Sequence, residues 1–187
     1  MATAAYIYDA VRTPRSKGKA GGTLNEVKPI QLGAGLLREL ESRHDLDTAL
    51  VGDVILGCTA AIGDQGACVA KAIVQAAHWD ESVPGVQMDR FCASGLEAVN
   101  MAAAKVGSDQ EDLVIAGGIE SMSRIPMLSG GGAMFTDPDF VIDQNSAPQG
   151  IGADLIATLD GYSREDVDAF AIESQRRAAH ARDSGWF

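Results

Sequence analysis

Short apolar runs alternate with longer amphipathic stretches along roughly the first 120 residues of the chain. Four apolar runs have the length of strands and predict strands at 4–11, 51–57, 84–88 and 113–117. Between them, apolar residues recur at steps of three and four, which predicts helices at 28–43, 65–78 and 94–106. This order indicates an α/β fold in which a layered βαβαβαβ sheet is covered by helices on both faces.

The pattern changes beyond residue 122, where turn-rich sequence begins. Two further helices are predicted at 149–160 and 163–183. The inward face of the second would carry Val167, Phe170, Ala171, Ser174 and Ala178. We therefore divide the chain into a first domain at 1–122 and a second region at 123–187.

Cys92 lies at the predicted turn between the strand at 84–88 and the helix that follows. Ser94 and Glu97 have the spacing of a capping box, which predicts that the helix starts there. Unpaired N–H groups and the positive end of the helix dipole favour a thiolate, and one N–H could stabilise an oxyanion. A small buried packing thiol is the commoner role of a cysteine. By position alone, both interpretations stay open.

Composition narrows the possible partners. The chain carries 15 basic and 26 acidic residues, and its net charge of −11 argues against nucleic acid or an anionic membrane surface. We expect no membrane span and, since the first residues lack a basic region, no signal peptide. Three cysteines in no paired spacing indicate neither a disulfide framework nor a metal site, which suits the reducing cytoplasm.

Several other groups receive structural interpretations. Basic residues crowd a Pro- and Gly-containing stretch at 12–22, which we interpret as a solvated loop and not as a patch that steers phosphate; they are Arg12, Arg15, Lys17 and Lys19. We expect His44 to cap a helix C-terminus, and Cys58 and Cys68 to pack as thiols. Neither a Gly-x-Gly-x-x-Gly motif after the first strand nor a P-loop is present, so we reject a nucleotide-binding function.

Four blocks of the sequence resemble landmarks of the thiolases, enzymes that make or cleave 3-ketoacyl thioesters. The first surrounds Cys92, with Asp-Arg-Phe-Cys-Ala-Ser-Gly-Leu-Glu-Ala at 89–98. The others lie at 8–14, 116–127 and 161–171, in the order that the family has them. The resemblance implies a thiolase-type N-terminal core domain at 1–122, part of the loop domain at 123–187, and no C-terminal core domain.

The resemblance also implies a function and its residues. Cys92 would be the nucleophile that carries the acyl group as a thioester, with its own backbone N–H as an oxyanion donor. The substrates would be coenzyme A and acyl-CoA, with no bound cofactor and no metal, and the full-length form would be a homodimer or homotetramer. Gln149 stands where acetoacetyl-type relatives often carry Met beside the acyl pocket, which favours a degradative 3-ketoacyl-CoA thiolase of beta-oxidation.

Thiolases take their base from a Gly-His-Pro motif and a second cysteine from a Cys-x-Gly motif, and this sequence has neither. We therefore name no base, and we expect the chain to be a fragment or inactive alone. A split-enzyme subunit and a non-catalytic acyl-CoA-binding module remain alternatives. A carrier-protein-dependent condensing enzyme fits less well, because its nucleophile typically lies in a Thr-Ala-Cys-Ser-Ser context, which the sequence around Cys92 does not match.

Overall fold

The computed structural model describes residues 4–186. The expectation that the chain has no signal peptide rests partly on residues 1–3, which lie outside the described residues. The helices and strands up to residue 118 are α1 (Pro29–His44), β1 (Asp53–Gly57), α2 (Val69–Ala77), β2 (Val86–Met88), α3 (Ser94–Gly107) and β3 (Val114–Gly118), with 3-10 turns η1 (Thr48–Leu50) and η2 (Gly63–Gln65). Four helices follow: α4 (Ala133–Thr136), α5 (Pro138–Asp143), α6 (Gln149–Asp160) and α7 (Arg164–Asp183).

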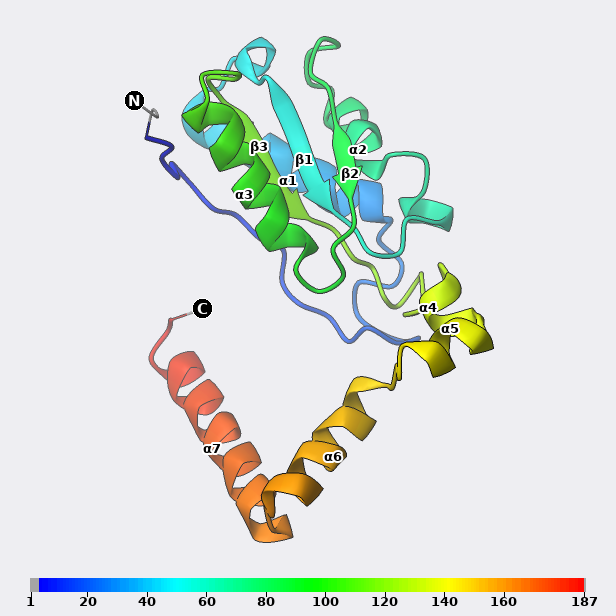
Figure 1. The fold of residues 1–187 in the computed structure, drawn as a ribbon. Helices are drawn as coiled ribbons and strands as arrows, with labels where there is room; N and C mark the ends of the chain where they lie inside the picture. The colour runs from blue at the N-terminus through cyan, green and yellow to red at the C-terminus, as the bar shows by residue number, and fades with distance from the viewer. Residues whose placement is uncertain (1–3, 187) are drawn as a thin grey trace. The chain divides into compact units, whose positions relative to one another are not determined.

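The three strands form one parallel sheet in the order β2-β1-β3 (Figure 1). In the central strand, Ile55 is level with Val86 of β2 and with Ala116 of β3. Every residue of β1 is buried, which explains its nearly continuous apolar sequence.

Helices cover both faces of the sheet. Val54, Leu56 and Cys58 pack with residues of α1 and α2 in one core cluster. Ile55 points the other way and packs with Ala98 and Ala102 of α3. Figure 1 shows the same arrangement, with α3 on one side of the strands and α1 and α2 on the other. The predicted α/β sheet with a helix layer on each face is therefore confirmed.

The prediction of a strand at 4–11 is wrong. In the structure these residues belong to no strand, and Tyr6, Ile7 and Tyr8 are exposed. A strand is stable only when a neighbouring strand accepts its hydrogen bonds, and residues 4–11 pair with none of β1, β2 or β3. The observed sheet thus has three strands and not four.

One prediction about a helix face also needs correction. The inward face predicted for α7 is not buried, because Phe170 is 80% exposed and α7 has no buried residue. In α3 the side chain of Leu96 is 67% exposed, whereas Ala98 and Ala102 are buried. The periodicity identified each helix, but the surface that each apolar face meets is a tertiary property.

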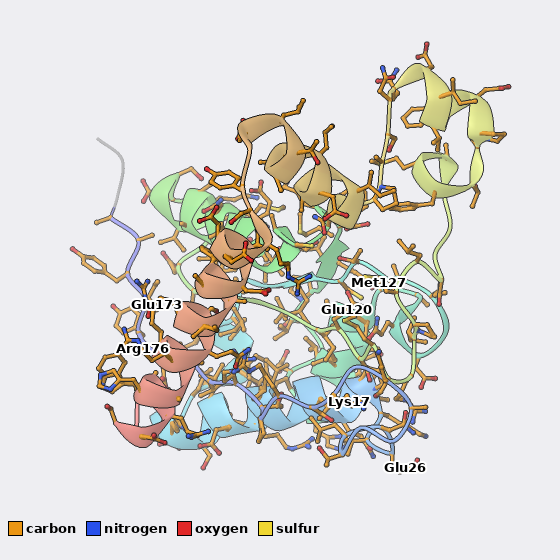
Figure 2. The ribbon with its side chains drawn as sticks, turned by 90° about the horizontal axis from the view of Figure 1, so that it is seen from below. Lys17, Glu26, Glu120, Met127, Glu173 and Arg176 are labelled. Atoms are coloured by element: carbon orange, nitrogen blue, oxygen red, sulfur yellow. The ribbon has the colours of Figure 1, made fainter. Side chains whose placement is uncertain are left out.

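The chain separates into two compact units, of which one ends at Gly131 and the other begins at Gly132. Within the described residues, the regular elements of the second unit are all helices, joined by short turns. In α7, a capping box between Ser163 and Asp166 starts the helix. Further along α7, Glu173 pairs with Arg176 one turn later (Figure 2). The assignment of 1–122 and 123–187 to a core domain and a loop domain stays a prediction.

Candidate active site

Cys92 lies in the short turn that connects β2 to α3. It is exposed, and it is separated from the first residue of α3 only by Ala93. The position of the turn is set by Gly57 at the end of β1, where a Cβ atom would collide with the backbone of Ser94 and Gly95. The first turn of α3 therefore rests directly on the end of the central strand, as the strand–turn–helix pattern predicted.

The residue before the cysteine has an unusual backbone conformation. Phe91 has φ of +48°, in the left-handed region that bulky side chains rarely occupy. Its N–H donates to Asp89 Oδ1 at 2.7 Å. Its carbonyl oxygen accepts from the N–H of Ser94 at 3.0 Å and from the hydroxyl of Ser94 at 2.6 Å. Hydrogen bonds on both sides of Phe91 thus hold the strained turn.

The predicted capping box at the start of α3 is wrong. The N-cap residue is Ala93, and the helix has no side-chain cap. Ser94 is the first helical residue, and its hydroxyl accepts from the Arg90 N–H at 2.8 Å within the turn. The carboxylate of Glu97 pairs instead with the Arg90 guanidinium at 3.3 Å. Both side chains thus contact Arg90 in the turn that carries Cys92, Ser94 through the backbone N–H and Glu97 through the guanidinium, and Glu97 also accepts from the side-chain amide of Asn100 in α3 at 3.3 Å.

Three polar residues that the sequence analysis did not single out adjoin this turn. Thr59, just after β1, donates its hydroxyl to the Phe91 carbonyl at 3.2 Å. The Thr59 N–H donates to Glu120 Oε2 at 2.8 Å, and Gln65 Nε2 donates to Glu120 Oε1 at 2.7 Å. Glu120, labelled in Figure 2, follows β3 closely in the chain. No sequence spacing indicates this group, because its members come from three separate segments.

The other two cysteines differ from Cys92 in environment. Cys58 is 1% exposed in the core, and burial, followed by the charge of Glu120, raises its thiol pKa to about 11. Cys68 is half-buried, and its thiol donates to the Gly85 carbonyl at 3.3 Å. Both line a cavity of about 370 Å³ whose lining does not include Cys92. Their predicted packing role agrees with these positions.

The three histidines are engaged elsewhere. His44 is the last residue of α1 and Asp45 is the capping residue, so the predicted cap role of His44 is wrong. The Nε2 atom of the His44 ring lies 2.9 Å from Asp9 Oδ2, and this hydrogen bond lowers the pKa of the Asp9 carboxyl. His78 ends α2 in a left-handed conformation. His180 meets the Trp186 ring edge-on, with 5.1 Å between the ring centroids. None of these contacts involves the turn of Cys92.

The remaining predicted groups are placed as follows. Gln149 is the first residue of α6, in the second unit. Arg12, Arg15, Lys17 and Lys19 are exposed in a loop, as expected, and Figure 2 labels Lys17 there. Within residues 4–186, no group of three or more His, Cys, Asp or Glu residues could hold a metal ion. In the same range, no helix is both long and apolar enough to cross a membrane.

Comparison with known proteins identifies relatives over nearly the whole chain. The family description "Thiolase, N-terminal domain" matches residues 5–187. The chain is 39% identical to the steroid 3-ketoacyl-CoA thiolase of Mycobacterium tuberculosis, over 99% of this chain and 48% of that protein. It is 36% identical to the beta-ketoadipyl-CoA thiolase of Pseudomonas aeruginosa, over 100% of this chain and 50% of that protein. It is also 36% identical to the 3-ketoacyl-CoA thiolase of Bacillus subtilis, over 98% of this chain and 46% of that protein. The chain spans about half the length of these relatives.

Proposed function

The chain belongs to the thiolase family, and on that premise we propose that it carries the nucleophile of an acyl-CoA acyltransferase. The proposed reaction is that of 3-ketoacyl-CoA and coenzyme A to give a shortened acyl-CoA and acetyl-CoA, or its reverse. Cys92 would hold the acyl group as a thioester between the two transfers. The observation that carries the proposal is the exposed Cys92 in a rigid turn at the start of α3.

The environment of Cys92 suits this role. Cys58 is buried with a raised pKa, and Cys68 is half-buried, so Cys92 is the accessible thiol of the three. Within the described residues, the Cys92 N–H donates to no acceptor. An acyl oxygen beside the sulfur would therefore find an unpaired donor. The base and the second cysteine that the family uses are not among the residues of this chain, and the proposal is limited to acyl transfer onto Cys92.

Substrate and assembly are further parts of the proposal. Relatives named 3-ketoacyl-CoA thiolase favour a degradative thiolase of beta-oxidation, with Gln149 beside the acyl group. We propose a homodimer or homotetramer, since β2 is an edge strand of the described sheet and the apolar side chains Leu96 and Val99 of α3 are exposed. The three unpaired thiols support a reducing, cytoplasmic location.

The test is incubation with acetyl-CoA followed by mass analysis of the intact chain and of its peptides. We expect one acetyl group on the peptide that contains Cys92 and none on those that contain Cys58 or Cys68. Cys92→Ser should abolish the modification. Acetylation that is unchanged in Cys92→Ser, or a wild-type chain that is never acetylated, would contradict the proposal.

A further inference from the structure

Within the described residues, three hydrogen bonds hold the peptide that joins Phe91 to Cys92. Its carbonyl oxygen accepts from the Ser94 N–H at 3.0 Å, from the Ser94 hydroxyl at 2.6 Å and from the Thr59 hydroxyl at 3.2 Å. A trans peptide is planar, so its C=O and N–H groups point in opposite directions. Whatever fixes the Phe91 carbonyl therefore also fixes the direction of the Cys92 N–H.

Thr59 is itself held from a second direction. Its backbone N–H donates to one oxygen of Glu120, whose other oxygen accepts from the amide of Gln65. The Gln65 side chain is fully buried, and its Oε1 accepts from the Ser121 N–H at 2.6 Å. Its Nε2 also donates to the Ala60 carbonyl at 3.0 Å. A buried amide with partners on both polar atoms has one orientation, which it imposes on Glu120.

The group thus forms a continuous path from the core to the nucleophile. It begins at Gln65, passes through Glu120 to Thr59, and ends at the Phe91 carbonyl. Each link is a hydrogen bond of 3.2 Å or less, and the segments that it joins lie after β1, in η2, after β3 and before α3. Hydrogen bonds to a carbonyl also polarise its peptide, which makes the N–H on the other side a stronger donor.

We propose that Thr59 and Ser94 are positioning residues for the Cys92 N–H, the oxyanion donor, and that Gln65 and Glu120 hold Thr59 in place. This inference rests on the proposed function. In the acyl-transfer step, the Cys92 thiolate attacks the thioester carbonyl carbon, a C–S bond forms, and the carbonyl electron pair moves onto oxygen. The oxyanion accepts from the Cys92 N–H. When the C=O bond re-forms, the bond to the coenzyme A sulfur breaks, and the released thiolate takes a proton from water.

The test compares two reactions of the same sulfur. Acetylation by acetyl-CoA passes through an oxyanion, whereas alkylation by iodoacetamide is a direct displacement at carbon and forms none. A change that only misplaces the oxyanion donor should slow the first reaction and leave the second unchanged. A change that alters the thiolate, its exposure or the fold of the turn should slow both.

The variants are Thr59→Val, which removes the hydroxyl at nearly constant shape, and Thr59→Ser, which keeps it. Thr48→Val is a matched control, because the Thr48 hydroxyl also bonds a backbone group, the Asp80 N–H at 3.1 Å, but lies before β1, at the opposite end of the strand. Each rate constant is measured at Cys92 by mass analysis of the full chain. Ser94→Ala is a second variant that removes a different bond to the same carbonyl.

We expect Thr59→Val to lower the acetylation rate constant about tenfold, less than the roughly 100-fold loss typical when an oxyanion donor itself is removed. Alkylation should be unchanged, Thr59→Ser should restore most of the acetylation rate, and Thr48→Val should match the wild type. Ser94→Ala should also slow acetylation more than alkylation.

Three results would overturn the inference. If the wild type is acetylated and Thr59→Val is acetylated equally fast, the positioning role is wrong while the proposed function stands. The same conclusion follows if Thr59→Val slows alkylation as much as acetylation. If wild-type Cys92 is not acetylated at all, the proposed function fails and the positioning role fails with it.

Discussion

The buried amide of Gln65 donates a hydrogen bond of 2.7 Å to the carboxylate of Glu120, a residue 55 positions later in the chain. Gln65 lies in η2 after the central strand, and Glu120 lies just after β3. The contact therefore ties together the segments that follow two neighbouring parallel strands. Because Glu120 also accepts from the Thr59 N–H, and the Thr59 hydroxyl donates to the Phe91 carbonyl, it connects the core to the turn that carries Cys92.

Replacing Gln65 with Met tests how much the hydrogen bonds of the Gln65 side chain contribute to the stability of the fold. The change keeps the length of the side chain but leaves the buried Ser121 N–H without its acceptor. We expect the free energy of unfolding to fall by about 2–3 kcal/mol, the cost of an unpaired buried polar group. Urea denaturation followed by circular dichroism measures it. Gln75→Met, at an exposed position of α2, is the matched control and should change little; equal stability of the two variants would contradict the prediction.

The buried thiol of Cys58 predicts a loss of stability at alkaline pH. Burial, and then the charge of Glu120, raises its pKa from 9.0 to about 11, so the folded chain keeps the proton that the unfolded chain loses. The stabilisation is complete below about pH 9 and declines as the pH rises to about 11, by about 2–3 kcal/mol for one such group. Urea denaturation at a series of pH values measures it.

The control for this prediction is Cys58→Ala. Tyrosines and lysines titrate in the same range in both proteins, so the informative quantity is the difference between the two curves. That difference should shrink as the pH rises. A difference that stays constant from pH 8 to pH 11 would show that the Cys58 thiol is not linked to unfolding.

The ion pair between Lys105 and Asp53 fixes α3 to the start of the central strand. Lys105 Nζ donates to Asp53 Oδ2 at 2.8 Å, which raises the pKa of Lys105, and Asp53 is only 6% exposed. Within the described residues, Asp53 Oδ1 has no hydrogen-bond partner. Lys105→Met would leave a buried carboxylate without a counter-charge, so we expect the free energy of unfolding to fall by about 3 kcal/mol.

A second substitution distinguishes the lost charge pair from lost packing. Adding Asp53→Asn to Lys105→Met removes the unpaired charge, and the double variant should be more stable than Lys105→Met in the same urea titration. If the double variant is less stable than Lys105→Met, the unpaired carboxylate of Asp53 is not the cause of the stability lost in Lys105→Met.

The exposure of the three thiols predicts the order in which they react. At neutral pH, iodoacetamide should modify Cys92 first, Cys68 later and Cys58 only after unfolding, because Cys58 is buried and its pKa is raised. Peptide mass analysis over time checks this order, and the same reaction in urea should modify all three alike. Modification of Cys58 before Cys92 in the folded chain would contradict the structure.

The sequence by itself determined the longer helices, the strands of the sheet and the turn that carries Cys92, whereas the short helices α4 and α5 lie in the stretch that it indicated as turn-rich. Their apolar periods of two to four residues are local and depend only on neighbours in the chain. The blocks around Cys92 and at 116–127 indicated the family, and the comparisons confirmed it. These features can be predicted without knowing which elements pack against one another.

Only the tertiary structure decided which surfaces meet. The apolar run at 4–11 forms no strand without a partner, and Val167 and Phe170 of α7, which were expected to face inward, are exposed. The path from Gln65 through Glu120 and Thr59 to Phe91 joins residues that parallel pairing of strands brings together. No regular spacing in the sequence predicts such contacts, because the free energy of a buried hydrogen bond depends on which groups are neighbours in space and not on which are neighbours along the chain.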